Sequence, residues 1–297
     1  MQSPSSLREG NRIKIISTAR KISHEELVPA ITLLKSWGLE VELGKHLFDE
    51  YNQFAGEDEK RAADFQEALD NPDIKAVLFA RGGYGTVRII DKIDFSKFKK
   101  NPKWLCGYSD ITVIHNHVHR LDIETLHSTM PINFKDNSVL SLNSLKQVLF
   151  GEKLHISADH FHLNRNGSAN GEVVGGNLSI LYSLTGTNSD LDTNGKILFI
   201  EDLDEYLYHI DRMMQNLLKS GKLANLKGLI VGGMTEMNDN SIPYGKTASE
   251  IISETVSEFH FPVCYIFPAG HQKDNRCLIL GRQANFIVDE QGASLSF

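Results

Sequence analysis

An almost wholly apolar run, Ile74 to Ala80, constrains the fold of this chain more than any other stretch. The run has the length of a strand and no alternation of apolar and polar residues, which is typical of a strand in a parallel sheet that is covered on both faces. A glycine-rich turn, residues 81–85, follows it directly. Segments with helical and strand patterns alternate around this run, so we predict an α/β fold.

Apolar spacing and turn residues predict the other elements. In the first half we expect strands at residues 12–17, 39–43, 74–80 and 104–106, and helices at 25–37, 57–69, 86–90 and 111–120. In the second half we expect strands at 197–200, 229–232, 263–267 and 284–288, and helices at 178–184, 208–220 and 248–259. Between the halves, residues 155–171 are polar and rich in turn formers, which indicates a linker or a peripheral hairpin. We therefore expect an N-terminal α/β domain at 1–150, a linker at 151–170 and a C-terminal mixed α/β domain at 171–297.

Composition excludes several classes of protein. The 297 residues carry a formal charge of −7, which argues against a nucleic-acid partner. The three cysteines are far apart and lack metal-ligand spacing, so a reducing compartment is expected. No apolar run of about 18 residues is present, and residues 1–10 lack a signal-peptide core, so we expect a cytoplasmic protein without membrane insertion.

Ser109 is the candidate nucleophile. It follows the predicted strand that ends at Cys106, and a predicted helix begins just after it. Such a turn exposes a serine hydroxyl beside free backbone N–H groups, although Gly-x-Ser-x-Gly is absent here. The alternative is that Ser109 or Asp110 is only a helix N-cap. In a parallel sheet this turn and the glycine turn at 81–85 lie at the same edge, where sites form.

Candidates for a base and its orienting carboxylate stand in the second half. Glu201 directly follows the predicted strand 197–200, and His271 lies in a glycine-bearing loop after the strand 263–267. Histidine titrates near neutral pH and suits proton transfer. The alternatives are a surface histidine for His271, and for the acidic group around Glu201 a charged helix start or a divalent-metal site.

Three further patterns receive other interpretations. The alternating His115, His117 and His119 lack a His-Glu-x-x-His arrangement, so we read them as helix-surface or supporting groups rather than metal ligands. The turn at 81–85 lacks the pattern of a phosphate-binding loop and fits an oxyanion hole better. Cys106 is expected to pack in the core.

Taken together, four motifs resemble the LD-carboxypeptidase family of serine peptidases. The resemblance runs from about Ile13 to Gly281, and each motif is specific only in combination with the others. The motifs are Arg81-Gly82-Gly83-Tyr84-Gly85, Gly107-Tyr108-Ser109-Asp110-Ile111-Thr112, Gly175-Gly176-Asn177-Leu178 and Leu198-Phe199-Ile200-Glu201-Asp202, followed by Pro268-Ala269-Gly270-His271.

The resemblance implies a flavodoxin- or Rossmann-like parallel-sheet domain and a smaller mixed α/β domain of the swivelling β/β/α type. It implies a triad of Ser109, Glu201 and His271, without a metal or other cofactor, that hydrolyses the amide bond between an L-centred diamino acid and the terminal D-alanine of murein tetrapeptides. It also suggests a homodimer.

The remaining site residues are assigned from the family pattern and their position. The Gly83 and Asp110 N–H groups are candidate oxyanion donors, and Arg81 is the candidate partner of the substrate carboxylate, unless it forms a structural ion pair. Asn177 either lines the cleft or belongs to a tight turn that opens the helix at Leu178.

Two other functions remain open. A related branch of the family hydrolyses microcin-type peptidyl-nucleotide conjugates with the same triad, and a nucleotide- or sugar-binding module would use the glycine loops without catalysis. The chain also departs from the family pattern at two places: residues 126–131, Leu-His-Ser-Thr-Met-Pro, replace a His-Gly-Pro-Met-like stretch, and residues 16–19, Ile-Ser-Thr-Ala, replace Ala-Pro-Ser. Substrate preference therefore depends on residues outside the triad.

Overall fold

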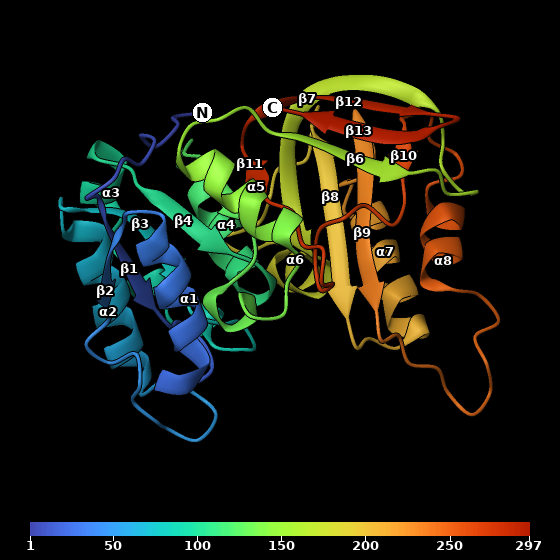
Figure 1. Cartoon of the computed structure of the whole chain (residues 1–297). Helices are drawn as coiled ribbons and strands as arrows, with labels where there is room; N and C mark the ends of the chain where they lie inside the picture. The colour runs from blue at the N-terminus through green and yellow to red at the C-terminus, as the bar shows by residue number, and fades with distance from the viewer.

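The computed structural model describes all residues, 1–297, as two sheets flanked by helices (Figure 1). The first sheet has six strands in the order β11-β5-β4-β3-β1-β2, and its first five strands along the chain are parallel. The short β11 from the C-terminal half pairs antiparallel with β5. The strands are β1 Arg12–Ile16, β2 Glu40–Leu43, β3 Ile74–Phe79, β4 Trp104–Gly107, β5 Thr125–His127 and β11 Leu278–Leu280. The predicted parallel α/β architecture is confirmed.

Helices cover the first sheet. They are α1 His24–Ser36, α2 Asp58–Asp70, α3 Ser96–Lys100, α4 Thr112–His119 and α5 Val139–Leu149. The helix expected at 86–90 is instead a pair of 3₁₀ turns, η1 Thr86–Arg88 and η2 Ile90–Lys92, because the preceding Gly85 has a φ of +147° and the segment is too short for an α-helix.

The second sheet has seven strands in the order β10-β9-β8-β7-β12-β13-β6. The strands β7 to β10 are parallel, and β12, β13 and β6 continue the sheet antiparallel. The strands are β6 His155–Asp159, β7 Gly167–Asn177, β8 Ile197–Leu203, β9 Gly228–Thr235, β10 Val263–Cys264, β12 Gln283–Asp289 and β13 Gly292–Ser296; the helices are α6 Leu178–Leu184, α7 Leu207–Lys219 and α8 Ala248–Thr255.

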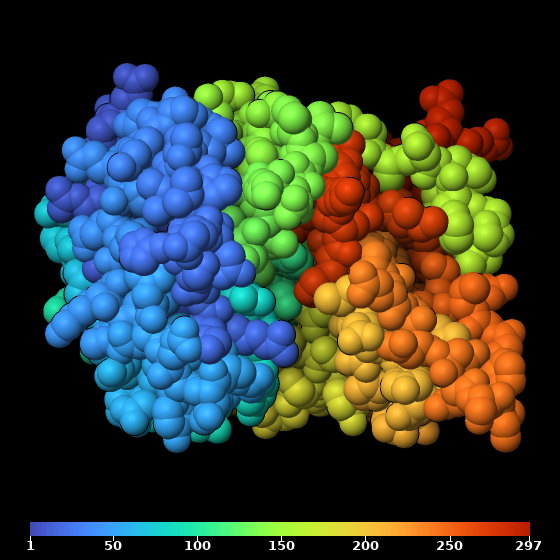
Figure 2. Space-filling model, turned by 60° about the horizontal axis from the view of Figure 1, so that its bottom comes forward, coloured from blue at the N-terminus to red at the C-terminus, as the bar shows by residue number.

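Two segments cross the expected domain limits. The segment 151–170 contains β6 and the first residues of β7, so it contributes to the second sheet. The strand β11 lies within 171–297 but adds to the first sheet. Its approach is fixed by Ser138, whose Oγ donates to Asp274 at 2.7 Å, and by Ser144, whose Oγ accepts from the Cys277 N–H at 2.8 Å. In Figure 2 the red segment that includes β11 lies between the green part of the N-terminal half and the yellow and orange parts of the C-terminal half.

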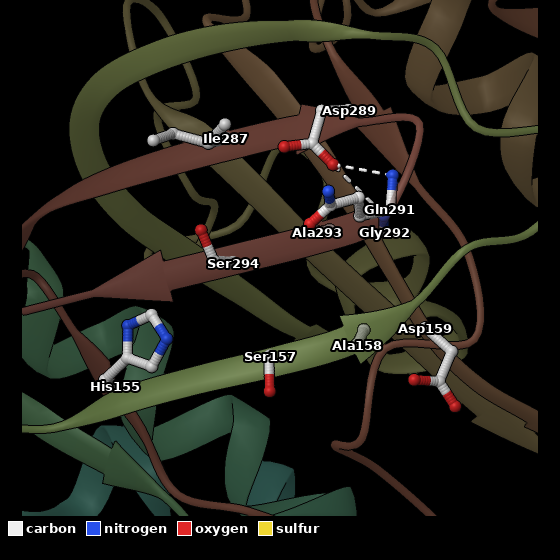
Figure 3. Close-up of a pocket in the computed structure, with 10 residues that line it drawn as sticks. All are labelled: His155, Ser157, Ala158, Asp159, Ile287, Asp289, Gln291, Gly292, Ala293 and Ser294. Carbon is white, nitrogen blue, oxygen red and sulfur yellow. Dashed lines mark hydrogen bonds between the residues drawn. The ribbon is translucent and has the colours of Figure 1, made fainter.

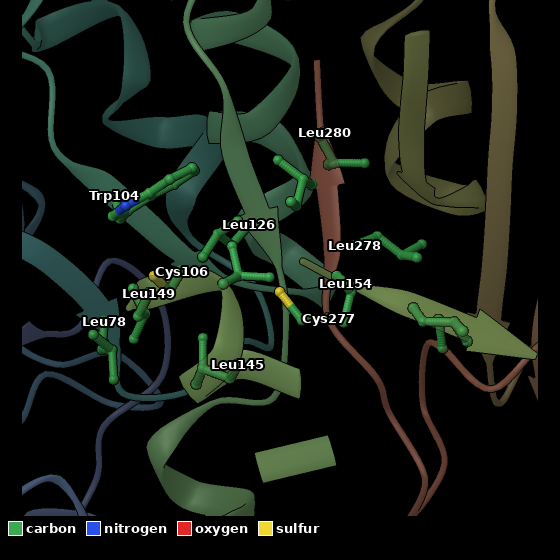
Figure 4. Packing of buried hydrophobic residues seen from close by; sticks show 14 of the residues in the cluster. Leu78, Trp104, Cys106, Leu126, Leu145, Leu149, Leu154, Cys277, Leu278 and Leu280 are labelled. Carbon is green, nitrogen blue, oxygen red and sulfur yellow. The ribbon is translucent and has the colours of Figure 1, made fainter. Parts of the chain in front are cut away.

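A shared apolar core joins the two sheets. One cluster of 38 buried residues includes Leu78 and Trp104 of the first sheet and Phe286 of the second. Figure 4 shows part of this cluster, including Leu78, Trp104 and Cys277. Cys106 is fully buried in this cluster, as predicted. Burying one surface common to both halves disfavours their separation and fixes the relative positions of the strand ends.

None of the helices is both long enough and apolar enough to cross a bilayer.

Candidate active site

Three strand ends bring Ser109, Glu201 and His271 together. Ser109 follows β4, Glu201 lies near the end of β8, and His271 lies in the loop between β10 and β11. The Ser109 hydroxyl lies 3.1 Å from Nε2 of His271, and Nδ1 of His271 lies 2.6 Å from Oε2 of Glu201. This hydrogen-bonded order is that of a nucleophile, a base and an orienting carboxylate.

The backbone of Ser109 is in the left-handed region. Its φ is +64°, an unfavourable value for a residue with a Cβ, and it begins the short 3₁₀ helix Ser109–Ile111. Neither Ser109 nor Asp110 caps the following helix α4; the Asp110 carboxylate instead accepts the Thr86 N–H at 2.9 Å. The N-cap interpretation of these residues is therefore wrong, and the turn presents the serine hydroxyl to His271.

The glycine turn lies directly against the nucleophile. A Cβ at Gly82 would lie 2.9 Å from the Ser109 Cβ and 3.0 Å from its Oγ, with the Asp110 backbone nitrogen at 3.5 Å. The next residue, Gly83, has a φ of +113° and lies against the side chain of Arg20. Only a backbone without side chains can approach Ser109 this closely.

A buried histidine holds the end of β4 in place. His115 of α4 donates from Nε2 to the Gly107 carbonyl at 2.8 Å and accepts at Nδ1 from the Thr125 hydroxyl at 2.9 Å. Burial lowers the pKa of His115 to about 3, so the ring is neutral. His117 and His119 have separate partners, Ser189 and Glu172. The three histidines thus have separate partners, and His115 supports the end of β4.

The glycine motif at 175–177 joins the second sheet to the nucleophile turn. A Cβ at Gly176 would lie 2.5 Å from the hydroxyl oxygen of Thr112, and the same hydroxyl accepts the Asn177 N–H at 3.0 Å. The Asn177 side chain caps α6 through Ile180 and donates to Asp202 at 2.9 Å. Its polar atoms are thus used within the fold, so Asn177 belongs to the turn that opens α6.

The acidic residues after β8 have separate roles. Asp202 also accepts the Ser179 N–H at 2.9 Å, Asp204 accepts from Asn238 at 2.8 Å, and Glu205 binds His209 at 2.6 Å. No group of three or more His, Cys, Asp or Glu side chains is placed to hold a metal ion. Of these residues only Glu201 contacts the base.

Burial and charge together set the protonation of the His271–Glu201 pair. The burial of Glu201 alone would raise its pKa, but the adjacent His271 lowers it below the usual value of 4.5. The burial of His271 alone would lower its pKa, but the Glu201 carboxylate raises it above 6.5. Glu201 is therefore ionised at neutral pH, and the neutral His271 carries its proton on Nδ1, which leaves Nε2 free to accept the serine proton.

This pair predicts the acid limb of the pH profile. Activity requires neutral His271, so kcat/KM should fall as the pH decreases through a midpoint above 6.5. In Glu201→Gln the carboxylate charge is lost while burial of the ring remains, so the midpoint of the residual activity should move to lower pH. Initial rates from pH 5 to 9 test both expectations, and an unmoved midpoint in the variant would contradict them.

The same pair stabilises the folded protein at low pH, where the activity is lowest. Because the folded-state pKa of His271 is raised, its contribution to the free energy of unfolding is present below pH 6.5 and is lost as the pH rises through the folded-state value.

Gly270 offers a steric test of the pair. Its φ is +105°, and a Cβ there would lie 2.7 Å from the Cβ and 2.8 Å from Oε2 of Glu201. We expect Gly270→Ala to lower kcat/KM about 100-fold, since small displacements of catalytic groups have effects of this size. Gly221→Ala is the matched control, because Gly221 has a φ of +78° and no atom within 4 Å of its Cβ position. It should lose stability but keep full activity; equal activity of the two variants would contradict the expectation.

Arg81, the predicted partner of the substrate carboxylate, is engaged within the protein. Its Nη1 donates to the Lys21 carbonyl at 3.1 Å. It forms no ion pair, so the alternative interpretation as a structural ion pair does not describe it. Its contact fixes the loop around Lys21 beside the glycine turn.

His127 is a residue of the site to which the sequence analysis gave no role. It is fully buried, with its ring 4.8 Å from Phe199 and 5.8 Å from Tyr108, whose own ring lies 4.7 Å from His271. Neither ring nitrogen has a hydrogen-bond partner, and the same holds for Oε1 of Glu201. Burial lowers the pKa of His127 to about 4, so it is neutral. The departure from the family pattern at 126–131 was the signal that could have marked it.

A pocket on the second sheet is separate from this site. It has a volume of about 360 Å³ and lies on β6, β12 and β13, where none of the predicted site residues contributes (Figure 3). Its lining residues include His155, Asp159 and Asp289.

Comparison with known proteins agrees with the resemblance that the sequence motifs showed. Residues 13–128 match the LD-carboxypeptidase N-terminal domain, and residues 170–286 match the LD-carboxypeptidase C-terminal domain. A probable murein peptide carboxypeptidase from Bacillus subtilis is 35% identical over 98% of this chain and 93% of its own length.

Solved structures of related proteins have the same fold as this chain. The muramoyltetrapeptide carboxypeptidase from Oxalobacter formigenes superposes with a TM-score of 0.87 at 31% identity and covers 96% of this chain and 98% of its own. A microcin C7 self-immunity protein in complex with aspartyl sulfamoyl adenosine has a TM-score of 0.88 at 20% identity, covering 99% of this chain and 98% of its own, which shows the shared fold.

Proposed function

Because the chain belongs to the LD-carboxypeptidase family, we propose that it hydrolyses the amide bond between an L-centred diamino acid and the terminal D-alanine of murein tetrapeptides, as in peptidoglycan recycling. The observation that carries this proposal is the hydrogen-bonded series Ser109–His271–Glu201 at the junction of the two halves. The relatives named as murein peptide carboxypeptidases support the substrate class.

The geometry supports a two-step acyl-enzyme mechanism. Nε2 of His271 takes the Ser109 proton while Oγ attacks the scissile carbonyl carbon, and Glu201 stabilises the imidazolium that forms. The N–H groups of Asp110 and Gly83 hold the oxyanion. His271 then gives its proton to the amine of D-alanine as the C–N bond breaks. A water molecule, deprotonated by His271, then attacks the ester carbonyl carbon. As the bond from this carbon to Oγ breaks, His271 returns the proton to Ser109, and the shortened peptide leaves with a free carboxyl group.

The oxyanion assignment is supported by the packing of the glycine turn. The position of a Cβ at Gly82 lies within 3.5 Å of both the Ser109 side chain and the Asp110 nitrogen, so the turn and the nucleophile share one small space. We further propose that the protein acts in the cytoplasm on small murein peptides and forms a homodimer, as the family resemblance implies.

A comparison of substrates tests the proposal. The protein should release D-alanine from a tetrapeptide with an L-centred diamino acid before D-alanine, and it should act at least 100-fold more slowly on the D-alanyl-D-alanine bond of the pentapeptide, since the reacting carbonyl would then be misplaced. The competing function is hydrolysis of aspartyl sulfamoyl adenosine, to which a protein of the same fold binds. A higher kcat/KM for that compound than for the tetrapeptide would replace the proposed substrate.

A further inference from the structure

We propose that Arg20 forms the binding site for the terminal carboxylate of the substrate. The inference rests on the proposed function, since a carboxypeptidase substrate ends in a free carboxylate one residue beyond the scissile bond. The terminal carboxylate is therefore about one residue length, roughly 3.3–3.6 Å, from the attacked carbonyl carbon, and its partner must stand next to the groups that surround that carbonyl. A guanidinium group is the natural partner, because its planar fork can bind both oxygens of a carboxylate.

Contacts place Arg20 beside the glycine turn at 81–85. A Cβ at Gly83 would lie 2.6 Å from Cγ and Cδ of Arg20 and 2.8 Å from its Nε, whereas a Cβ at Gly82 would lie 3.0 Å from Oγ of Ser109. The two glycines are consecutive, and consecutive Cα atoms are about 3.8 Å apart. The arginine side chain and the nucleophile thus flank neighbouring residues of one turn.

The backbone of Arg20 is held while its guanidinium group is free. Its N–H donates to the Gly82 carbonyl at 3.4 Å, and its carbonyl accepts from the Ser17 hydroxyl at 2.7 Å. The next residue, Lys21, is held through its carbonyl by Arg81. The guanidinium group of Arg20 has no hydrogen-bond or ion-pair partner in the protein, and the residue is exposed. A fixed backbone with an unpaired cationic head suits a group that binds a ligand.

The other cations near the site are less suitable. Arg81 donates to Lys21 and so supports the loop that carries Arg20. Lys273 follows His271 by two residues, but its carbonyl accepts from Ser138 at the start of α5, and no contact places its ammonium group beside Ser109. Arg20 directly follows residues 16–19, the stretch that departs from the family's Ala-Pro-Ser pattern.

The test compares acid and amide substrates. Wild type, Arg20→Gln and Arg20→Lys are assayed on the tetrapeptide as free acid and as C-terminal amide. Arg8→Gln is the matched control, because Arg8 is also exposed and borders a pocket with Asn11 and Lys75 at the opposite end of the first sheet. We expect Arg20→Gln to lower kcat/KM for the acid about 10- to 100-fold, the usual effect of losing a hydrogen bond to a charged group, and to leave the amide unaffected. Arg20→Lys should recover part of the loss, and Arg8→Gln should match wild type.

Binding is measured separately from catalysis. The same proteins are titrated by calorimetry with a tetrapeptide whose scissile amide is replaced by an uncleavable isostere, again as acid and as amide. Weaker binding of the acid alone in Arg20→Gln supports the proposal. Equal affinity of wild type and Arg20→Gln for the acid, or an equal loss for acid and amide, overturns it. If wild type cleaves neither peptide, the proposed function fails, whereas the titrations still decide the role of Arg20.

Discussion

Replacing Ser109 with alanine is expected to lower kcat for D-alanine release by about 10³- to 10⁶-fold, the range found when the nucleophile of a serine hydrolase is removed. Oγ of Ser109 is the atom that His271 reaches at 3.1 Å, and no other hydroxyl contacts Nε2. Ser183→Ala is the control, because the Ser183 hydroxyl is exposed and bonds only the Ile180 carbonyl. The assay is the initial rate of D-alanine release at saturating tetrapeptide.

A glycine at the same position separates activity from stability. With its φ of +64°, Ser109 stores backbone strain that alanine keeps and glycine removes. We expect Ser109→Gly to be as inactive as Ser109→Ala but to unfold with a free energy about 1 kcal/mol higher than that of the alanine variant. Urea unfolding measures this difference. A glycine variant less stable than the alanine variant would contradict the strained-turn interpretation.

Glu201→Gln is expected to lower kcat by about 10³- to 10⁴-fold, since an amide no longer holds the imidazole in the correct tautomer or stabilises the imidazolium. Glu201 is fully buried, and its Oε2 accepts both Nδ1 at 2.6 Å and the backbone N–H at 3.0 Å from His271. KM should change much less, because Glu201 does not contact substrate.

Asp204→Asn is the matched control for this charge removal, since Asp204 belongs to the same acidic segment but binds Asn238. It should retain wild-type activity. A Glu201→Gln variant that is active within about tenfold of wild type would exclude Glu201 as the orienting carboxylate, because such carboxylates contribute far more.

For some elements the local sequence pattern was sufficient to predict both the type of structure and its bounds. The strand at 74–80 and the helix at 178–184 were predicted from apolar spacing, and the structure has β3 Ile74–Phe79 and α6 Leu178–Leu184. Both segments bury residues in an order that their own sequence displays. The same patterns did not predict elements whose stability comes from partners that are distant in the sequence.

The strand β7 illustrates the missing information. Its sequence, Gly-Ser-Ala-Asn-Gly-Glu-Val-Val-Gly-Gly-Asn, has glycines and polar residues where a strand usually has branched apolar ones. It forms because β8 pairs with one side and β12 with the other, and because glycines 175 and 176 allow close contact with Phe199 and Thr112. Neither partner can be identified from the local sequence.

The site divides in the same way. Ser109, Glu201 and His271 were identified because motifs marked them, and their distances support the assigned roles. Arg81 was selected as the first residue of the glycine turn at 81–85, but the arginine that lies against that turn with an unpaired guanidinium group is Arg20. Its position depends on how the loop after β1 meets the loop after β3, which is a property of the folded sheet.

The central claim, that Ser109 attacks the terminal amide of a murein tetrapeptide without the help of a metal ion, is tested most directly by one assay. D-Alanine release is measured for wild type and Ser109→Ala, each with and without EDTA. We predict release by wild type that EDTA does not change and no measurable release by the variant. Release that EDTA abolishes, or release that persists in Ser109→Ala, would contradict the serine mechanism.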